Sequence, residues 1–256
     1  MMMSVRSKNI LLFAMFGVFV LLSLPVWGAD IQATLRRWTH ISEYSDREGI
    51  QNVRIKVTYY SNEYVEALVL SEAEKNLWTK DETENYKYTL LKSLNLNDSI
   101  AFHFDFNVTG VPMYAQPFDR HLTLMIGGKR YQPSDYDKRF NFKMLGERDG
   151  MVFFSRYDPK SGEDILERAK DVRLSMNGAV SQAMTAKGDA LWVWDISKDD
   201  PKALGTGTAM DRLELDRLIR RMEKLNQDRQ ELQTRLDEID KELGEIRSRS
   251  DQLQTR

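Results

Sequence analysis

The sequence predicts an α+β protein, in which an antiparallel β-sandwich-like domain with a helical excursion is followed by a long C-terminal coiled-coil helix. About eight or nine short stretches of alternating apolar and polar residues, separated by turn residues, predict the sandwich. Helical spacing between residues 63 and 94 predicts the excursion, and a C-terminal heptad repeat predicts the coiled coil. The predicted order is a signal peptide (1–28), a β-rich globular domain (29–198), a flexible linker (199–210) and the coiled coil (211–254).

The strands are predicted from period-two alternation and from the turns between them. In residues 51–60, Val53, Ile55, Val57 and Tyr59 share one face, and residues 31–44 are the expected hairpin partner across the turn 46–49. Gly127-Gly128 is predicted to be a two-residue hairpin turn, because glycine adopts positive φ without steric cost. The other expected strands are residues 101–108, 122–126, 129–131, a hairpin of 141–146 with 151–157, 171–177 and 190–196.

The helices of the domain are predicted from spacing and capping residues. Two helices are expected at about 63–77 and 80–94, and Thr79 with Glu82 forms a capping box for the second. Ser161 with Asp164 resembles a capping box that opens a short helix through Ala169. Residues 199–210 contain Pro201, Gly205 and Gly207 without apolar periodicity, which is typical of a linker.

The C-terminal segment carries an apolar seam with a strict seven-residue repeat, which predicts a left-handed coiled coil and therefore self-association. The alternative, a single solvated charged helix, would leave this narrow seam in water. In a parallel pair Arg235 meets Asp240 and Glu242 meets Arg247, so a parallel dimer or trimer is expected, with Arg229 as the weak layer. The predicted seam residues are Leu215, Leu218, Met222, Leu225, Arg229, Leu232, Leu236, Ile239, Leu243, Ile246 and Leu253.

The N-terminus indicates export. Arg6 and Lys8 precede an apolar run at residues 10–26, and small residues follow, which is the pattern of a secretory signal cleaved after Gly28. An uncleaved membrane anchor is the alternative, and only then would the membrane be a partner. The absence of cysteine excludes disulfides, thiol chemistry and a lipoprotein anchor, and fits a bacterial envelope protein, periplasmic or secreted. A net charge of −2 gives no indication of a nucleic-acid partner.

No catalytic, cofactor or metal motif stands out. The three histidines, His40, His103 and His121, do not have metal-ligand spacing, although His103 shares a strand face with Asp105. The pair Asp135 and Asp137 is better explained by a turn with Ser134 as its cap than by calcium binding. The aromatic residues are expected to fill the core, although they would also suit a sugar-stacking platform: Trp38, Trp78, Trp192, Trp194, Tyr59, Tyr60 and Tyr114.

The sequence therefore predicts an exported, non-enzymatic envelope protein that oligomerises through its coiled coil and presents β-rich domains to an envelope protein or a glycan. No cofactor is expected. Two alternatives stay open: a carbohydrate- or peptidoglycan-binding module, which needs exposed and aligned aromatic residues, and an envelope hydrolase, which needs two carboxylates facing each other across a cleft.

Overall fold

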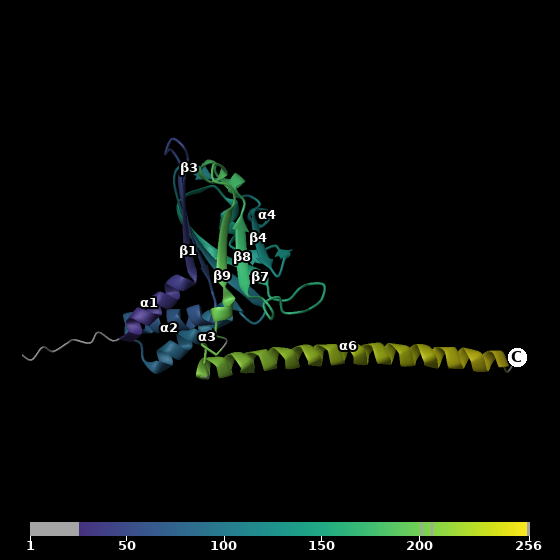
Figure 1. Cartoon of the computed structure of the whole chain (residues 1–256). Helices are drawn as coiled ribbons and strands as arrows, with labels where there is room; N and C mark the ends of the chain where they lie inside the picture. Colours follow the sequence, from purple (N-terminus) through teal and green to yellow (C-terminus); the bar gives the residue numbers. More distant parts are fainter. Residues whose placement is uncertain (1–25, 201, 206, 255–256) are drawn as a thin grey trace, which may run out of the picture.

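The computed structural model describes residues 26–200, 202–205 and 207–254, and shows a two-sheet domain from which one long helix projects (Figure 1). The predicted signal sequence lies outside the described residues up to position 25. The chain enters the domain through helix α1 (Val26–Arg37) and leaves it through helix α6 (Thr208–Gln254). None of the described helices is both long and apolar enough to cross a membrane.

The larger sheet is antiparallel and has the strand order β1-β2-β3-β7-β6. The predicted turn at 46–49 joins its first two strands, with Ser45 opposite Asn52. Its bounds are β1 (Thr39–Ser45), β2 (Asn52–Tyr59), β3 (Ser99–Met113), β6 (Asp135–Tyr136) and β7 (Met144–Ser155).

The smaller sheet is also antiparallel, with the order β5-β4-β8-β9. The predicted Gly127-Gly128 turn is confirmed: Ile126 pairs with Lys129, and both glycines have positive φ. Its bounds are β4 (Leu122–Ile126), β5 (Lys129–Tyr131), β8 (Asp171–Met176) and β9 (Ala190–Asp195). Short helical segments lie between the strands at α4 (Phe118–His121), η1 (Lys138–Asn141), η2 (Gly178–Val180) and α5 (Gln182–Thr185), and η3 (Ile196–Lys198) follows the last strand, β9.

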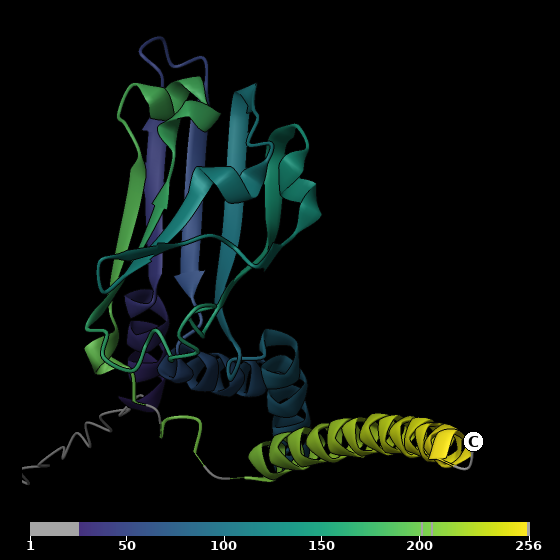
Figure 2. The same ribbon diagram turned by 90° about the vertical axis from the view of Figure 1, so that its right-hand side faces the viewer.

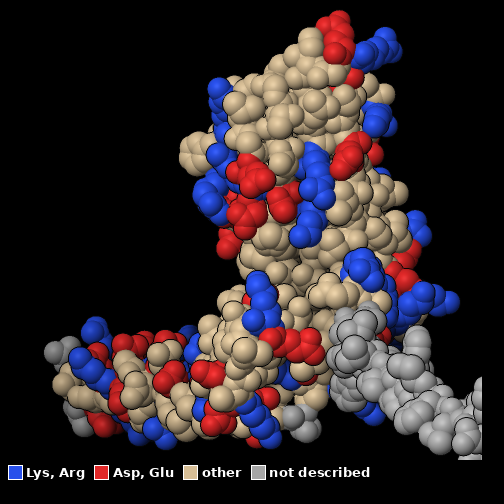
Figure 3. Space-filling model, turned by 90° about the vertical axis from the view of Figure 1, so that its left-hand side faces the viewer, with Lys and Arg blue, Asp and Glu red and all other residues tan. Residues whose placement is uncertain are grey.

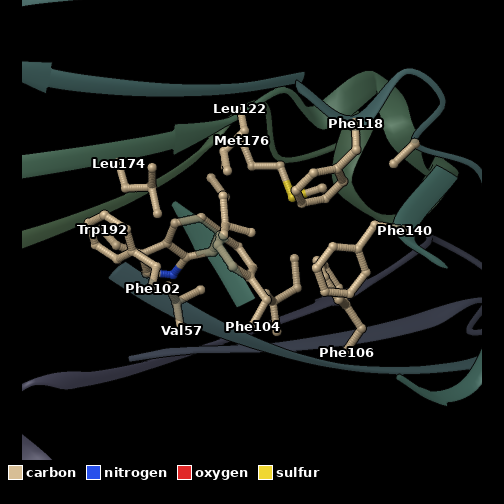
Figure 4. Packing of buried hydrophobic residues seen from close by; sticks show 14 of the residues in the cluster. Val57, Phe102, Phe104, Phe106, Phe118, Leu122, Phe140, Leu174, Met176 and Trp192 are labelled. Atoms are coloured by element: carbon tan, nitrogen blue, oxygen red, sulfur yellow. The ribbon is translucent and has the colours of Figure 1, made fainter. Parts of the chain in front are cut away.

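The core lies between the inner faces of the two sheets (Figure 4). From β3, Phe102 and Phe104 lie towards Leu174 and Trp192 of the smaller sheet, whereas Phe106 lies beside Phe140, and all are buried. The alternation that predicted these strands therefore identifies their core-facing side chains, and the predicted sandwich-like architecture is confirmed.

The helical excursion forms a second, smaller core at one end of the larger sheet. Helices α2 (Asn62–Asn76) and α3 (Lys80–Leu94) agree with the predicted ranges, and the Thr79–Glu82 capping box is present. Val65, Val69, Leu91 and Leu94 pack there together with Ala101 of β3. Figure 2 shows these helices between the sheets and α6, so the excursion is the platform on which α6 rests.

Three predictions of local structure were wrong. Residues 141–157 do not form a hairpin, because 144–155 is one strand that pairs with β3 over its length. Gly150 lies inside that strand because Phe140 and Asp137 pass over it, where a Cβ would come within 2.9 Å and 2.7 Å of their atoms.

The region 161–169 is a series of turns rather than a helix, because Asp158 and Asp164 bind nearby backbone N–H groups in non-helical patterns. The expected strand at 31–44 is helical up to Arg37, where the guanidinium is bonded to Glu63 of α2 at 2.8 Å.

Candidate functional site: the apolar seam of the C-terminal helix

Helix α6 is 47 residues long, which corresponds to roughly 70 Å at 1.5 Å per residue. It contains no proline and one glycine, Gly244, which lies in open space. Its N-terminus is capped from outside the helix, because the Ala209 N–H donates to the Glu84 carboxylate of α3 at 2.8 Å. Gly207 lies beside this contact, and a Cβ there would lie 2.9 Å from the same carboxylate oxygen, so a larger residue would displace the Glu84 side chain.

The eleven predicted seam residues all lie on α6, and all of them are exposed. The ten apolar side chains among them have exposed fractions between 44% and 65%. Arg229 is exposed at the same surface. Acidic and basic side chains are interspersed over the face of α6 that Figure 3 shows. The row of ten apolar side chains, interrupted by Arg229, is therefore open to solvent along α6.

The base of α6 is bound to α3 through its other side. Met210 and Leu213 are half-buried against the second core. The Asp216 carboxylate accepts hydrogen bonds from the Tyr88 hydroxyl at 2.7 Å and from the Lys92 ammonium at 3.0 Å. These two donors lower the pKa of Asp216. Arg212 donates to Asn85 at 2.6 Å, so about the first two turns of α6 are bound to the domain.

The segment that precedes α6 packs on the domain as well. Leu204 and Ala209 are buried, although both fall within the range predicted as a flexible linker. The buried Lys87 ammonium of α3 pairs with Glu66 of α2 at 2.6 Å and donates to the Leu204 carbonyl. Sequence reasoning missed Lys87 and Glu84, because neither the spacing nor the composition shows that a lysine or glutamate on α3 reaches a residue more than a hundred positions away.

Asp199 is a second contact that the sequence did not indicate. Its carboxylate accepts from the backbone N–H groups of Asn62 and Glu63 at 3.2 and 3.0 Å, at the N-terminus of α2. Burial raises the pKa of this carboxyl, and the α2 donors lower it in part. Asp199, which follows β9, thus caps the N-terminus of α2, so the C-terminal part of the domain is bonded to an element near its N-terminal part.

A cavity of about 230 Å³ adjoins Asp199 and is also lined by Tyr60, Arg156 and Glu167. Arg156 is occupied by Asp164 at 2.8 Å and by the Leu96 carbonyl at 2.8 Å. Asp199 and Glu167 are the two carboxylates of this cavity, and they would be the candidate pair for the hydrolase alternative. Both oxygens of Asp199 are bonded to α2, which is the arrangement of a helix cap.

The other sequence candidates do not come together into a site. His103 bonds to Asp149 at 3.2 Å across the strand pair, and His40 bonds to the Val193 carbonyl at 3.0 Å. His121 is half-buried at the end of α4. Within the described part of the chain, no group of three or more His, Asp or Glu residues could hold a metal ion.

The acidic pair Asp135 and Asp137 lies in and directly after strand β6 and is held by neighbouring cations. Asp135 pairs with Lys138 at 3.0 Å, and Asp137 binds Arg139 at 2.7 Å while it caps η1. Ser134 donates to the Phe153 carbonyl at 3.1 Å. The pKa values of both aspartates are lowered by these partners, Lys138 for Asp135 and Arg139 for Asp137. Asp135 thus lies in β6 and Ser134 bonds to β7, so the predicted turn with Ser134 as its cap is not formed; both carboxylates are paired with cations, unlike those of a calcium loop.

Three of the tryptophans are part of the core. Trp38, Trp192 and Trp194 are buried, and Trp78 is half-buried against Tyr86. Tyr114 is 60% exposed and lies at the end of β3 that is farthest from α6, beside the exposed Leu145 of β7. Exposed Ile50, in the turn before β2, and Phe142, before β7, belong to the same end of the sheet. The far end of the domain therefore presents apolar side chains, but no row of tryptophans.

Comparison of the chain with protein-family models, curated proteins and solved structures finds no match. The seam and its attachment to the domain are therefore interpreted from their own geometry.

Proposed function

We propose that this chain is an exported, non-enzymatic envelope protein that self-associates through the seam of α6 and presents its β-rich domains to a partner protein or a glycan. The observation that carries the proposal is the row of ten apolar side chains at heptad spacing, all exposed on a helix that projects from its own domain (Figure 1). The N-terminal sequence, with its basic start and apolar run, supports export.

The magnitudes favour self-association over a solitary helix. Removing a half-exposed leucine or isoleucine from water contributes roughly 1 kcal/mol, so the ten side chains contribute on the order of 10 kcal/mol per helix. Association costs about 4–15 kcal/mol in lost translational and rotational freedom, and two or three helices contribute together. A single α-helix in water is marginal, so pairing also stabilises the helix itself.

The partner-binding surface that we propose is the end of the sandwich farthest from α6, where Ile50, Tyr114, Phe142 and Leu145 are exposed. Several copies joined at α6 would raise the avidity for a partner without any new contact. The glycan-binding alternative has to rely on Tyr114 and Phe142, because three of the tryptophans are in the core. The hydrolase alternative relies on Asp199 and Glu167.

The test compares two double variants of the full-length mature chain. Leu232→Asp with Ile239→Asp places two carboxylates in the seam, whereas Gln227→Asp with Thr234→Asp places two carboxylates, again seven residues apart, on the opposite side of α6. Light scattering at tens of micromolar is expected to give an oligomer for the native chain and for the second variant, and the mass of one chain for the first. A monomeric native chain, or equal dissociation of both variants, contradicts the proposal.

A further inference from the structure

Helix α6 has two apolar faces on opposite sides of its axis. Met210 and Leu213 point towards the domain and are half-buried, whereas Leu215 and Leu218 are exposed. The step of two residues from Leu213 to Leu215 turns the apolar stripe by about 200°, since each residue advances the helix by about 100°. The first face serves the contact within the chain, and the second face begins immediately after it.

Most contacts between α6 and the domain lie on the first side as well, whereas Arg212, which bonds to Asn85, lies between the two faces, about 60° from Leu215. Ala209, Asp216 and Leu213 all lie within about 60° of one another around the helix, and their mean direction is roughly 160° from that of the seam at Leu215, Leu218 and Met222. A second helix can therefore pair with the seam from its first layer onwards without displacing α6 from its contacts with α3. Figures 1 and 2 show the long axis of the sandwich roughly perpendicular to α6.

The charges beside the seam decide the direction of pairing. In a parallel, in-register pair, Arg235 meets Asp240 of the second copy and Glu242 meets Arg247, and both contacts are attractive. In an antiparallel pair of full overlap, where Leu215 lies opposite Leu253, each g residue meets a g residue of the other copy.

Those antiparallel g contacts join like charges. Arg221 would meet Arg249, Asp228 would meet Glu242, and Arg235 would meet its own copy. One layer of the seam disfavours the parallel arrangement, because that arrangement places the Arg229 side chains of the two copies next to each other. A long arginine side chain at this position can extend its guanidinium out to solvent, so the flanking contacts prevail.

We infer that copies of this chain pair through α6 in parallel and in register, and that each domain stays docked on the outer side of the bundle. The inference rests on the proposed self-association and adds its geometry. The docking contacts fix the domains at one end, so their long axes radiate from the bundle. The exposed apolar ends of the domains then point away from one another and are free for separate contacts.

The test uses the absence of cysteine from the native chain. Ser250→Cys introduces a thiol at a seam position of the last turns, and Ser248→Cys introduces one two residues away on the outer side of the same helix. Under mild oxidation of the full chain, disulfide-linked dimers are expected for Ser250→Cys and not for Ser248→Cys, because only the first thiol meets its own copy in a parallel bundle.

A mixture of Leu218→Cys and Ser250→Cys chains separates the possible outcomes. An antiparallel bundle would link position 218 of one chain to position 250 of the other and leave Ser250→Cys alone unlinked, which overturns the direction but preserves the proposed self-association. Equal linkage at 248 and 250 overturns the fixed register. A native chain that is monomeric by light scattering overturns both proposals.

The outward placement of the domains has its own measurement. Spin labels at Arg47→Cys, in the turn between β1 and β2, are expected to give longer distances between copies than labels at Ser250→Cys. Distances as short at Arg47 as at Ser250 would overturn the radial arrangement.

Discussion

The sandwich and helix α6 use similar apolar residues in opposite ways. In the sandwich, Phe102, Phe104 and Phe106 alternate with polar residues along β3 and are fully buried, because the second sheet of the same chain covers them. In α6, Leu232 and Leu236 belong to two series of apolar residues that each recur every seven positions, and both side chains are exposed. The sandwich core is therefore closed within one chain, whereas the apolar row of α6 is left open to solvent and would be covered only by the self-association proposed above.

The region between them behaves like the domain. Leu204 and Ala209 are buried, and Lys87 holds the chain at Leu204 between α2 and α3. This segment, residues 204–209 with Lys87, is the joint between the domain and α6, and it fixes the position of the base of α6 on the domain.

The largest effect is expected from opening the closed core. Phe104→Ala removes a fully buried ring that contacts Phe106, Phe118, Phe140 and Trp192, and it should lower the free energy of unfolding of the domain by about 3–5 kcal/mol. Tryptophan fluorescence during urea unfolding measures this change, because Trp38, Trp192 and Trp194 lie in the domain.

Two controls sharpen this test. Phe142→Ala removes an exposed ring and should change the free energy by less than about 0.5 kcal/mol. Light scattering of Phe104→Ala should still show the oligomer, since α6 is outside the damaged core. If Phe104→Ala dissociates the oligomer while the domain remains folded, the separation between the two regions is wrong.

A smaller effect is expected at the joint. Lys87→Met leaves the Glu66 carboxylate and the Leu204 carbonyl without their cation. Removing one partner of a buried pair costs more than a surface pair contributes, but Glu66 is partly exposed, so we expect a loss of about 1–2 kcal/mol in urea unfolding. The double variant Lys87→Met with Glu66→Met should recover most of the loss, because no charge is then left unpaired.

The matched control for the joint is Lys75→Met. Lys75 forms an exposed pair with Glu72 at 3.6 Å on α2, and its loss should be close to neutral. Equal costs for Lys87→Met and Lys75→Met would show that the joint contributes nothing to the stability of the domain.

The parts that the sequence predicted well are those governed by local periodicity. The strand that carries Val53 to Tyr59, helices α2 and α3 with the Thr79–Glu82 box, and the Gly127-Gly128 turn follow from spacing and from the steric demands of glycine. The long helix α6 likewise follows from the seven-residue repeat maintained from Leu215 to Leu253, whereas the role of that repeat as an oligomer seam stays a prediction.

The parts that failed depend on distant contacts. Gly150 with its polar neighbours looks like a turn, and only the passage of Phe140 and Asp137 over it explains a glycine within β7. The sequence shows that the apolar positions shift to the opposite side of the helix between Leu213 and Leu215. Only the position of α3 shows that the first side packs on the domain. The surface that would bind a partner has no local signal, because Ile50, Tyr114 and Phe142 are far apart in the chain.

The smallest effect is expected from pH, and it is confined to the domain. Asp158 accepts hydrogen bonds from the Lys129 ammonium at 2.8 Å and from the backbone N–H groups of Lys160 and Ser161, which lowers its pKa to about 2. In the unfolded chain an aspartate has a pKa of about 3.9. The folded-state pKa is the lower one, so the contribution of Asp158 to stability is present above about pH 4 and is lost as the pH falls towards 2.

Asp158→Asn should therefore make the fall in stability between about pH 4 and pH 2 shallower, as measured by urea unfolding followed through the buried tryptophans. Glu48→Gln is the control, because Glu48 lies in the exposed turn before β2 and makes no hydrogen bond or ion pair among the described residues. The oligomer mass of Asp158→Asn should match that of the native chain over this range, since the group is remote from the seam. An unchanged slope for Asp158→Asn would mean that its bonds to Lys129 and the turn are absent in solution.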